Sequence, residues 1–320
     1  MGTELVQSNM CKESVMQTTV EPREVVPARV PVGIPISVIV AARNEAKNLP
    51  RCLKSLAGMG DVYVIDSQSS DETVEVARSA GAKVAHFHYH GGWPKKRQWA
   101  LETLPLAYEW VLLLDADESL TPELHAELQR AMASGDCNGY AISLQIHFLG
   151  RELRHSGAKF QKLVFFRRDK GHYECRLKDQ NISMCDMEVH EHVVVEGKTG
   201  TLRASLLHYN VESLSRYIQK HNEYSNWEAG VWAAGETSYN DLPPALLGTQ
   251  AQRRRWLRKN LLALPGSPFL FFIYKYVLRL GFLDGVPGLI YCAMQGIQFF
   301  HIKAKIYEAK HSAELTQCAE

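Results

Sequence analysis

The sequence has no Cys-x-x-Cys pair among its seven cysteines, so neither a disulfide framework nor a zinc knuckle is indicated. Free thiols are typical of proteins in a reducing compartment. The chain also has no excess of either charge, since 36 Lys and Arg residues oppose 35 Asp and Glu residues. We therefore expect no nucleic-acid partner. What remains is a 320-residue chain that is long enough to bury a large core.

Long apolar runs are missing as well. The most apolar segment, between Pro268 and Phe300, is interrupted by Lys275 and Arg279 and then by Asp284 and two glutamines. It does not reach the ~20 uninterrupted apolar residues of a membrane-spanning helix. The N-terminal residues lack the apolar core of a signal peptide, and we expect the polar residues 1–33 to form a disordered lead-in.

The most informative feature that is present is Asp115-Ala116-Asp117, which follows the apolar run Trp110–Leu114. A short run of this kind is typical of a buried strand in a parallel sheet. Carboxylates at the end of such a strand most often hold a divalent cation and the phosphates bound to it. The alternative is an acidic turn before a helix that Thr121 caps and Pro122 begins.

Strands and helices alternate through the first half of the chain. Apolar segments at 36–42, 62–66, 82–87 and 110–114 predict strands, and helices are expected to about Leu56 and over 72–79. This alternation favours an α/β fold with a mostly parallel sheet. Three of these strands end in polar residues, namely at Arg43-Asn44-Glu45, Asp66 and Asp115/Asp117. Their convergence on one sheet edge predicts a nucleotide site.

The second half has a different composition. Strands are expected at 139–144 and 162–166, and helices at 214–232, 250–262 and within 268–300. Arg253, Arg254 and Arg255 stand beside aromatic, amphipathic segments, a pattern of proteins that lie on an anionic membrane surface. An ordinary buried helical hairpin is the alternative interpretation of this region.

Several motifs, taken in order, resemble the family-2 glycosyltransferases with a GT-A fold. They are Ala41-Ala42-Arg43-Asn44-Glu45, Asp66-Ser67-Gln68-Ser69-Ser70-Asp71, Asp115-Ala116-Asp117, Val189-His190-Glu191 and His208-Tyr209. Together these motifs resemble the branch that contains lipopolysaccharide-core β-glucosyltransferases. Gln98 and Val164-Phe165-Phe166-Arg167 depart from the pattern of that branch. The resemblance implies a Rossmann-like α/β domain at 34–210, a helical membrane-associating region at 211–309 and a tail at 310–320.

The resemblance also implies an activity and a donor site. We expect an inverting, metal-dependent hexosyltransferase that uses a nucleotide diphosphate sugar, with UDP-glucose as the expected donor. Its acceptor would be a hydroxyl of a lipid-linked or lipopolysaccharide-type glycan. The expected cofactor is Mg²⁺ or Mn²⁺, which hard oxygen ligands suit. The residues expected to bind the donor are Ala41, Arg43, Glu45, Asp66, Lys96, Arg97 and Asp115.

The remaining assignments concern the metal and the base. Asp117 is the expected direct metal ligand, Asp115 lies on the ribose or the metal's water shell, and His192 is a candidate for completing the metal site. The relatives' His-Glu pair makes Glu191 the expected general base, with Glu188 as its alternative.

Two other functions stay open. A sugar-nucleotide pyrophosphorylase would need a glycine-rich phosphate loop after the first strand, where this chain has no glycine. A non-catalytic adaptor on the membrane would not need Asp66, Asp115, Asp117 and Glu191 together. For the transferase, we expect a cytoplasmic, peripheral location on the inner face of the cytoplasmic membrane.

Overall fold

A computed structural model describes residues 33–317, apart from 159, 189–190, 211–212 and 234–241. These residues lie in one compact unit, Val32–Glu320. The predicted lead-in falls outside the described residues except for Gly33. The division of the unit near residue 210 and the separate tail stay predictions.

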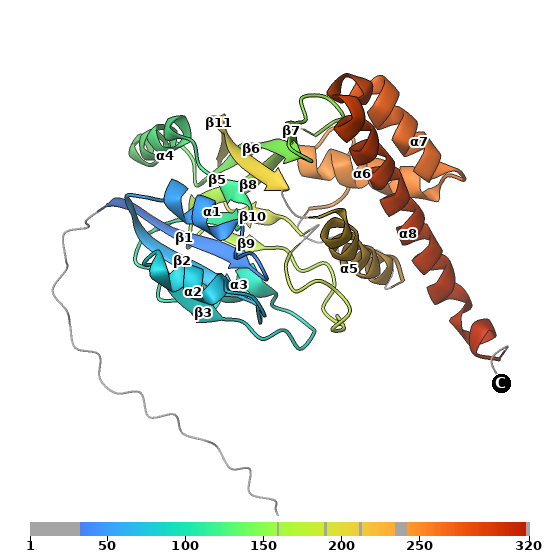
Figure 1. Ribbon diagram of the computed structural model, residues 1–320, viewed down its shortest axis with the longest axis horizontal. Coiled ribbons are helices and arrows are strands. Elements are labelled where there is room, and N and C mark those ends of the chain that lie inside the picture. The colour runs from blue at the N-terminus through green and yellow to red at the C-terminus, as the bar shows by residue number, and fades with distance from the viewer. Residues whose placement is uncertain (1–32, 159, 189–190, 211–212, 234–241, 318–320) are drawn as a thin grey trace, which may run out of the picture. The chain divides into compact units, whose positions relative to one another are not determined.

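Nine strands of the described chain form one sheet, in the order β3-β2-β1-β4-β8-β6-β11-β5, with β7 paired to β6 (Figure 1). The first four strands are parallel to one another, as predicted. β8 then enters antiparallel to β4 and to β6, so the complete sheet is mixed. The bounds are β1 Ile34–Ala42, β2 Met59–Asp66, β3 Lys83–His86, β4 Trp110–Asp115, β5 Glu118–Ser119, β6 Gly139–Phe148, β7 Arg151–Glu152, β8 Phe160–Arg167 and β11 Thr199–Asn210.

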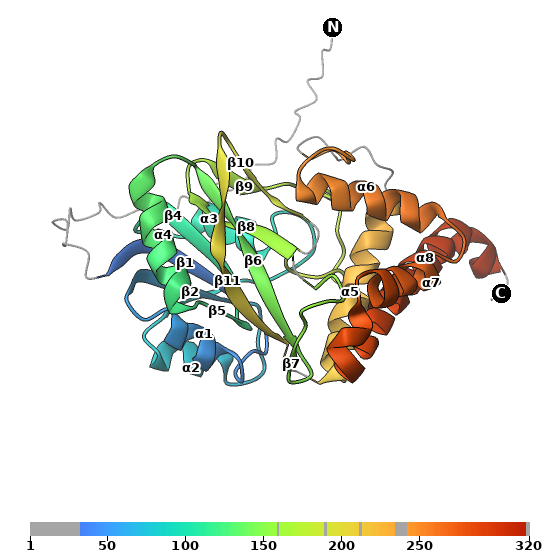
Figure 2. The ribbon, with the colours of Figure 1, turned by 90° about the horizontal axis from the view of Figure 1, so that it is seen from above.

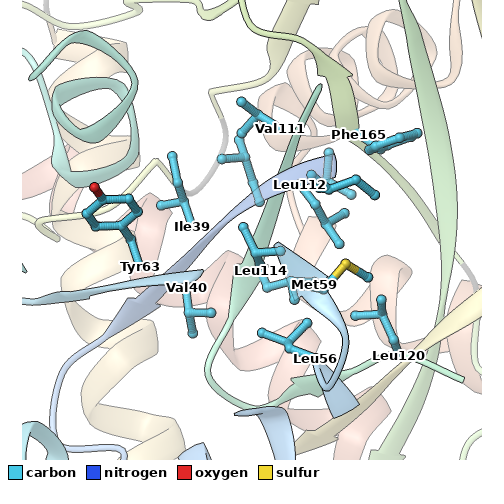
Figure 3. Packing of buried hydrophobic residues seen from close by; sticks show 14 of the residues in the cluster. Ile39, Val40, Leu56, Met59, Tyr63, Val111, Leu112, Leu114, Leu120 and Phe165 are labelled. Atoms are coloured by element: carbon cyan, nitrogen blue, oxygen red, sulfur yellow. The ribbon is translucent and has the colours of Figure 1, made fainter. Parts of the chain in front are cut away.

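The core lies where the apolar runs predicted it. Val38, Ile39 and Val40 of β1 are fully buried, and Val111 and Leu112 of β4 pack beside them (Figure 3). Both faces of these two strands are covered, which explains why their sequences are continuously apolar rather than alternating. Full burial of each such side chain stabilises the fold by about 1.5–3 kcal/mol.

Helices cover the sheet on both sides. In Figure 2 the sheet stands between α4 on one side and α5 to α8 on the other. The Thr121 hydroxyl accepts a hydrogen bond from the Leu124 amide at 3.2 Å, so it caps α4 as predicted. The acidic turn and the capped helix therefore occur together. The helices of this half are α1 Leu49–Ser55, α2 Thr73–Ser79, α3 Lys96–Thr103 and α4 Pro122–Ser134.

The C-terminal part is helical but broken. Leu280 has a φ of 56°, and a Cβ on Gly281 would lie 2.7 Å from Cys292 Sγ and 2.8 Å from the Lys275 carbonyl oxygen. Only glycine fits this close approach, so the chain turns here instead of continuing as one helix. The elements are α5 Leu214–Ala233, α6 Gln250–Ala263, α7 Ser267–Ile273, the π-helix η1 Tyr274–Leu278, the 3₁₀-helix η2 Gly281–Asp284 and α8 Gly285–Gln317.

The broken segment also bears on the membrane question. Within the described residues, no single helix has the length and apolar composition to cross a bilayer. The pair Ser267–Leu278 and Gly281–His311 meets both requirements only when taken together, and it is bent by 72°.

Candidate active site

A cavity of about 1150 Å³ opens at the carboxyl ends of β1 and β4. Strand register explains the position, because Ala41 of β1 pairs with Asp115 of β4. The cavity is larger than the ~300–1,000 Å³ typical of small-ligand pockets, which leaves room for two substrates. Of the predicted site residues, all but Asp66 line it: Ala41, Arg43, Glu45, Lys96, Arg97, Asp115, Asp117, Glu188, Glu191 and His192.

Asp115 is held between two cations. One of its oxygens accepts a hydrogen bond from Arg97, and the other lies 2.8 Å from Lys162 Nζ. Burial favours the neutral acid, but Arg97 and Lys162 outweigh it and hold the pKa of Asp115 well below its usual range. Asp115 is therefore a carboxylate whose negative charge is already matched within the protein.

Asp117 is in the opposite situation. Its Oδ1 is buried and has no hydrogen-bond partner in the described structure, while His208 Nδ1 lies 3.7 Å away. Burial raises the pKa of Asp117 to about 6, although His208 opposes the shift. An orphaned buried carboxylate oxygen is costly unless a ligand satisfies it.

The pair formed by Asp117 and His208 suits a divalent cation. A carboxylate oxygen and an imidazole nitrogen are both donors to Mn²⁺, and Mg²⁺ is commonly held by one or two carboxylates plus substrate phosphates and water. The described residues contain no group of three or more His, Cys, Asp or Glu side chains that could hold a metal ion. A cation here would therefore take part of its coordination from the donor and from solvent.

Lys96 and Arg97 lie at the start of α3 and are buried. Lys96 Nζ lies 3.0 Å from the Ala42 carbonyl oxygen and 3.0 Å from Asp186 Oδ2. Arg97 donates to the Glu188 carbonyl oxygen at 3.2 Å as well as to Asp115. Lys96 therefore connects the first strand to the 186–188 segment, and Arg97 connects Asp115 of β4 to the same segment.

Glu45 and Arg43 follow β1 as predicted. Glu45 is buried, and its Oε1 lies 2.8 Å from Lys220 Nζ of α5. Arg43 is exposed, and its carbonyl oxygen accepts a hydrogen bond from Arg216 at 3.2 Å. Because Lys220 and Arg216 belong to α5, this helix closes the site over the end of the first strand.

Asp66 stands apart from the other predicted donor residues. It ends β2 beside Ala42, but it does not line the cavity. Its carboxylate accepts from the Ser69 amide at 3.3 Å and lies 3.5 Å from His86 Nδ1. The structure thus gives Asp66 a role in holding the Ser67–Ser70 turn, next to the edge of the cavity.

The two candidate bases differ in how their oxygens are used. Glu188 accepts from the Gln98 amide at 2.9 Å and from the Arg97 amide at 3.3 Å, so both oxygens cap the first turn of α3. Glu191 Oε2 lies 3.1 Å from Lys95 Nζ, in an ion pair that is not aligned as a hydrogen bond. Burial raises the pKa of Glu191 to about 7, against the opposing effect of Lys95. Glu191 is therefore the carboxylate with an oxygen available near neutral pH.

The predicted histidine ligand lies elsewhere in the cavity. His192 immediately precedes β10 (Val193–Val195), which pairs with β9 (Gly171–Tyr173). Burial, together with Arg255, Arg176 and Arg254, lowers its pKa to about 3. His190 of the same motif falls outside the described residues. The histidine beside Asp117 is His208 of β11.

Three site residues were not predicted: Lys162, His208 and Lys220. Lys162 Nζ bridges Asp115 and Glu118, at 2.8 and 2.7 Å. Of the three, only His208 carried a signal in the sequence, since His208-Tyr209 is one of the motifs that resemble the family. Lys162 and Lys220 reach the site through β8 and α5, whose placement no local pattern indicates.

Comparison with known proteins agrees with this architecture. The family model described as glycosyl transferase family 2 matches residues 37–192. A lipopolysaccharide core biosynthesis glycosyltransferase of Rhizobium meliloti is 26% identical over 283 residues, covering 86% of this chain and 93% of that protein. An uncharacterized glycosyltransferase of Rickettsia conorii is 30% identical over 199 residues, covering 61% of this chain and 69% of that protein.

Among solved structures, TarS residues 1–349 of S. aureus in complex with UDP-GlcNAc is similar at 15% identity, over 87% of this chain and 92% of that one, with a TM-score of 0.41. The assignment to a family rests on the sequence comparisons and not on this structural similarity. The α/β sheet, with a cavity at the ends of its strands, has the GT-A type of architecture. The enzyme class predicted from the motifs is thereby confirmed, and the chain belongs to glycosyl transferase family 2.

Proposed function

We propose that this glycosyltransferase moves a sugar, with inversion, from a UDP-sugar to a hydroxyl of a lipid-linked or lipopolysaccharide-type glycan, with Mg²⁺ or Mn²⁺ as cofactor. UDP-glucose is the donor that we expect. The observation that carries the proposal is the orphaned Oδ1 of Asp117, buried beside His208 at a sheet edge, within a cavity that can hold two substrates. The family match favours transfer over the pyrophosphorylase alternative.

The first strand and α3 provide the donor side of the cavity. In the proposal, the Ala41–Ala42 backbone and Glu45 contact the nucleotide, and Lys96 and Arg97 face its diphosphate. Asp117, with Asp115 and His208 nearby, would hold the cation, which supplies Lewis-acid stabilisation of the leaving diphosphate. Lys96 and Arg97 pair with Asp186 and Asp115 in the unliganded protein, and would pair with phosphates when the donor binds. Their charges are therefore neutralised with and without the donor.

Glu191 is the proposed general base. The transition state of sugar transfer resembles an oxocarbenium ion, and the acceptor hydroxyl must lose its proton as it attacks. A carboxyl with a pKa of about 7 is ionised in half of the molecules at neutral pH and is a stronger base than an ordinary glutamate. One base on the acceptor side and direct displacement give inversion at the anomeric carbon.

The C-terminal helices support a membrane-surface role for residues 211–309. Large apolar side chains are exposed on α7, η1 and α8, among them Phe269 at 66%, Leu278 at 70% and Phe300 at 61%. Exposed apolar residues next to cations are typical of helices that lie in the bilayer interface. A relative named for lipopolysaccharide core synthesis fits an acceptor assembled at such a surface. We place the enzyme on the cytoplasmic face, where its free cysteines would stay reduced.

Donor binding is the first test. Calorimetric titration of UDP-glucose, other UDP-sugars and a GDP-sugar, each with and without Mn²⁺, should give metal-dependent binding of one UDP-sugar to the wild type. Asp117→Asn should lose the metal dependence, whereas Asp136→Asn, an exposed aspartate outside the cavity, should keep it. Binding of no nucleotide sugar by the folded protein would contradict the proposal.

Acceptor and membrane are tested separately. Cosedimentation with vesicles of phosphatidylglycerol and phosphatidylcholine should be strong for the wild type and weak for a Phe269→Ser, Leu278→Ser double variant. Ile182→Ser is the matched control, because Ile182 is 76% exposed but lies outside the C-terminal helices. Equal sedimentation of all three proteins would remove the membrane-surface role and leave the donor site untouched.

A further inference from the structure

Three cations line the C-terminal wall of the cavity without a counter-ion. They are Lys275 of η1, Arg279 just after η1, and Arg254 of α6. None of the three has an ion pair with a carboxylate among the residues that the structure describes. This wall belongs to the same cavity as Asp117 but is formed by different elements.

Lys275 is the most unusual of the three. Its side chain is buried, with 8% exposure, and its ammonium group faces two aromatic rings, Phe271 at 5.5 Å and Tyr291 at 5.0 Å. Other buried cations of this protein have carboxylates: Lys95 lies 3.1 Å from Glu191, and Lys96 lies 3.0 Å from Asp186. A buried charge normally requires a partner of opposite charge. Because no described residue supplies one to Lys275, we expect a ligand to do so.

The neighbouring cations increase this deficit. Burial, together with Arg254, Arg279 and Arg258, lowers the pKa of Lys275 to about 8, against the opposing effect of Cys292. Arg258 differs from the other two because it pairs with Glu228 at 3.4 Å. The guanidinium of Arg254 stacks on Phe160, 5.2 Å from the ring centre, and so keeps its donors free at the edges.

A glycine of the turn before β8 lies next to two of these cations. Gly157 has a φ of 62°, and a Cβ built on it would lie 3.6 Å from Arg279 Nε and 3.9 Å from Lys275 Cε. The turn before β8 therefore approaches both cations with no side chain between them. A ligand group that enters from the cavity meets the two cations and the glycine backbone together.

We propose that Lys275, Arg254 and Arg279 form a subsite for a phosphate group, positioned on the acceptor side of the cavity. Three cations on one wall of the cavity suit the three oxygens of a phosphate better than the two of a carboxylate, and arginine is suited to bidentate contact with phosphate. Lys275 is buried against aromatic rings, which strengthens its attraction to a charged group, whereas Arg254 and Arg279 are exposed. The assignment to the acceptor rests on the proposed function, since the donor diphosphate is assigned to the wall of Lys96 and Arg97.

The same chemistry has two possible sources. One is a phosphate carried by the acceptor itself, and the other is the headgroup of a membrane lipid, because Leu278 and Leu280 beside Arg279 are exposed. The experiment therefore needs one arm with a soluble phosphate and one with a bilayer.

The test uses the full-length protein with its donor site first saturated by UDP and Mg²⁺, and this first titration reports on the proposed function alone. Inorganic phosphate is then titrated by calorimetry into the UDP-saturated wild type and four variants: Lys275→Met, Arg279→Gln, Arg254→Gln and Arg253→Gln. Arg253 is the matched control, because it is adjacent to Arg254 on α6 and is also exposed, but does not line the cavity. Circular dichroism confirms that each variant is folded.

We expect phosphate to bind the wild type and Arg253→Gln equally, and to bind Lys275→Met and Arg279→Gln about tenfold or more weakly, as loss of one charge-assisted contact predicts. UDP affinity should be the same in all five proteins. Phosphate binding that is absent from the wild type, or that Lys275→Met and Arg279→Gln leave unchanged, overturns the subsite even when UDP binds normally.

The bilayer arm identifies the source. Vesicles of phosphatidylglycerol with phosphatidylcholine are compared with phosphatidylcholine alone, for the wild type and the same variants. Loss of phosphatidylglycerol-dependent binding in Lys275→Met supports the subsite with a lipid headgroup as its ligand. Unchanged vesicle binding together with weakened phosphate binding supports it with the acceptor's own phosphate as the ligand.

Discussion

The two walls of the cavity treat buried charge in opposite ways. On the wall built by β1, β4 and α3, cations and carboxylates are matched, as in Lys96 with Asp186 and Asp115 with Arg97 and Lys162. On the wall built by α6 and η1, Lys275 is buried against aromatic rings and pairs with no carboxylate of the described residues. Both walls are positive in part. On the second, Arg255 pairs with Glu174 and Arg258 with Glu228, but Lys275 has no carboxylate partner among the residues that the structure describes.

This difference indicates two ways of receiving an anion. A matched wall can exchange its own carboxylates for phosphates, so the unliganded protein is not strained by repulsion. On an unmatched wall, the unpaired buried cation lowers the stability of the folded protein until an anion binds and neutralises it. Variants on the two walls should therefore differ in the sign of their effect on stability as well as in the step of the reaction that they affect.

The largest effect is expected for Glu191→Gln. Loss of a general base lowers the rate about 10²–10⁴-fold, and transfer to acceptor should fall accordingly while donor binding stays unchanged. Glu188→Gln is the control, because its remaining amide oxygen can still accept from the first turn of α3. The wild-type rate should rise with pH through about 7, as Glu191 loses its proton, and this rise should be missing from Glu191→Gln. A pH-independent wild-type rate between pH 6 and 8, or equal losses in both variants, would take the base away from Glu191.

Asp117→Asn should have the next largest effect. The variant keeps the shape of the side chain but loses the charge that attracts a cation, so several kcal/mol of transition-state stabilisation, or about 10²-fold or more in rate, should be lost. Mn²⁺ titration in the presence of UDP gives the direct measurement. Asp71→Asn serves as the control, since Asp71 forms hydrogen bonds with Thr73 and Ala46 outside the cavity. Transfer by Asp117→Asn at the wild-type rate would show that no cation is held there.

Lys96→Met tests the matched wall. Lys96 is 1% exposed, and its loss leaves Asp186 buried without its cation, which should cost about 3–5 kcal/mol of unfolding free energy. The pKa of Asp186 is lowered in the folded protein, chiefly by Lys96 against the effect of burial, so the pair stabilises the fold above the unfolded pKa. The difference between variant and wild type should therefore shrink as the pH falls below about 4.

Lys83→Met provides the comparison for that measurement. Lys83 also pairs with a buried aspartate, Asp61, at 2.8 Å, but its own side chain is 57% exposed. Asp61 keeps hydrogen bonds from Ser37 and the Ala107 amide, so the loss should be about 1 kcal/mol or less. If Lys96→Met and Lys83→Met lost equal free energy of unfolding, burial of the cation would not make the Lys96 pair more important than the exposed Lys83 pair.

The sequence predicted the matched wall better than the unmatched one. The apolar runs of β1 and β4 and the polar residues after them have a local pattern, and the site at their ends was found where the pattern placed it. Lys162 and Lys220 were missed because their contacts with Asp115 and Glu45 span 47 and 175 residues of the chain. Pairings of that length depend on the order of strands, which alternation of elements does not reveal.

The C-terminal region shows the same limit at shorter range. The sequence predicted helix within 268–300 and identified Lys275 and Arg279 only as interruptions of an apolar run. Their common function depends on the turn at Leu280-Gly281, which folds η1 back so that Gly281 packs on Cys292. A glycine within an apolar segment is only a weak indication of a turn. The sequence does not show that this glycine packs against Cys292, eleven residues later.

Lys275→Met should change stability less than Lys96→Met and in the opposite direction, and this contrast best separates the two walls. A lysine pKa lowered from 10.5 to about 8 means that the buried ammonium destabilises the fold by about 3 kcal/mol at neutral pH. Between pH 8 and 10.5 the unfolded chain binds the proton that the folded protein has lost, so wild-type stability should rise with pH in that window.

Lys275→Met should remove both the penalty and the rise, which makes it about 1–3 kcal/mol more stable than the wild type at pH 7 in denaturant unfolding. Phosphate, by supplying the missing counter-ion, should reduce this difference, because it stabilises only the protein that retains the lysine. Arg253→Gln should follow the wild type throughout. If Lys275→Met were instead as unstable as Lys96→Met, the two walls would not differ in kind, and the ammonium of Lys275 would have to be matched within the folded protein.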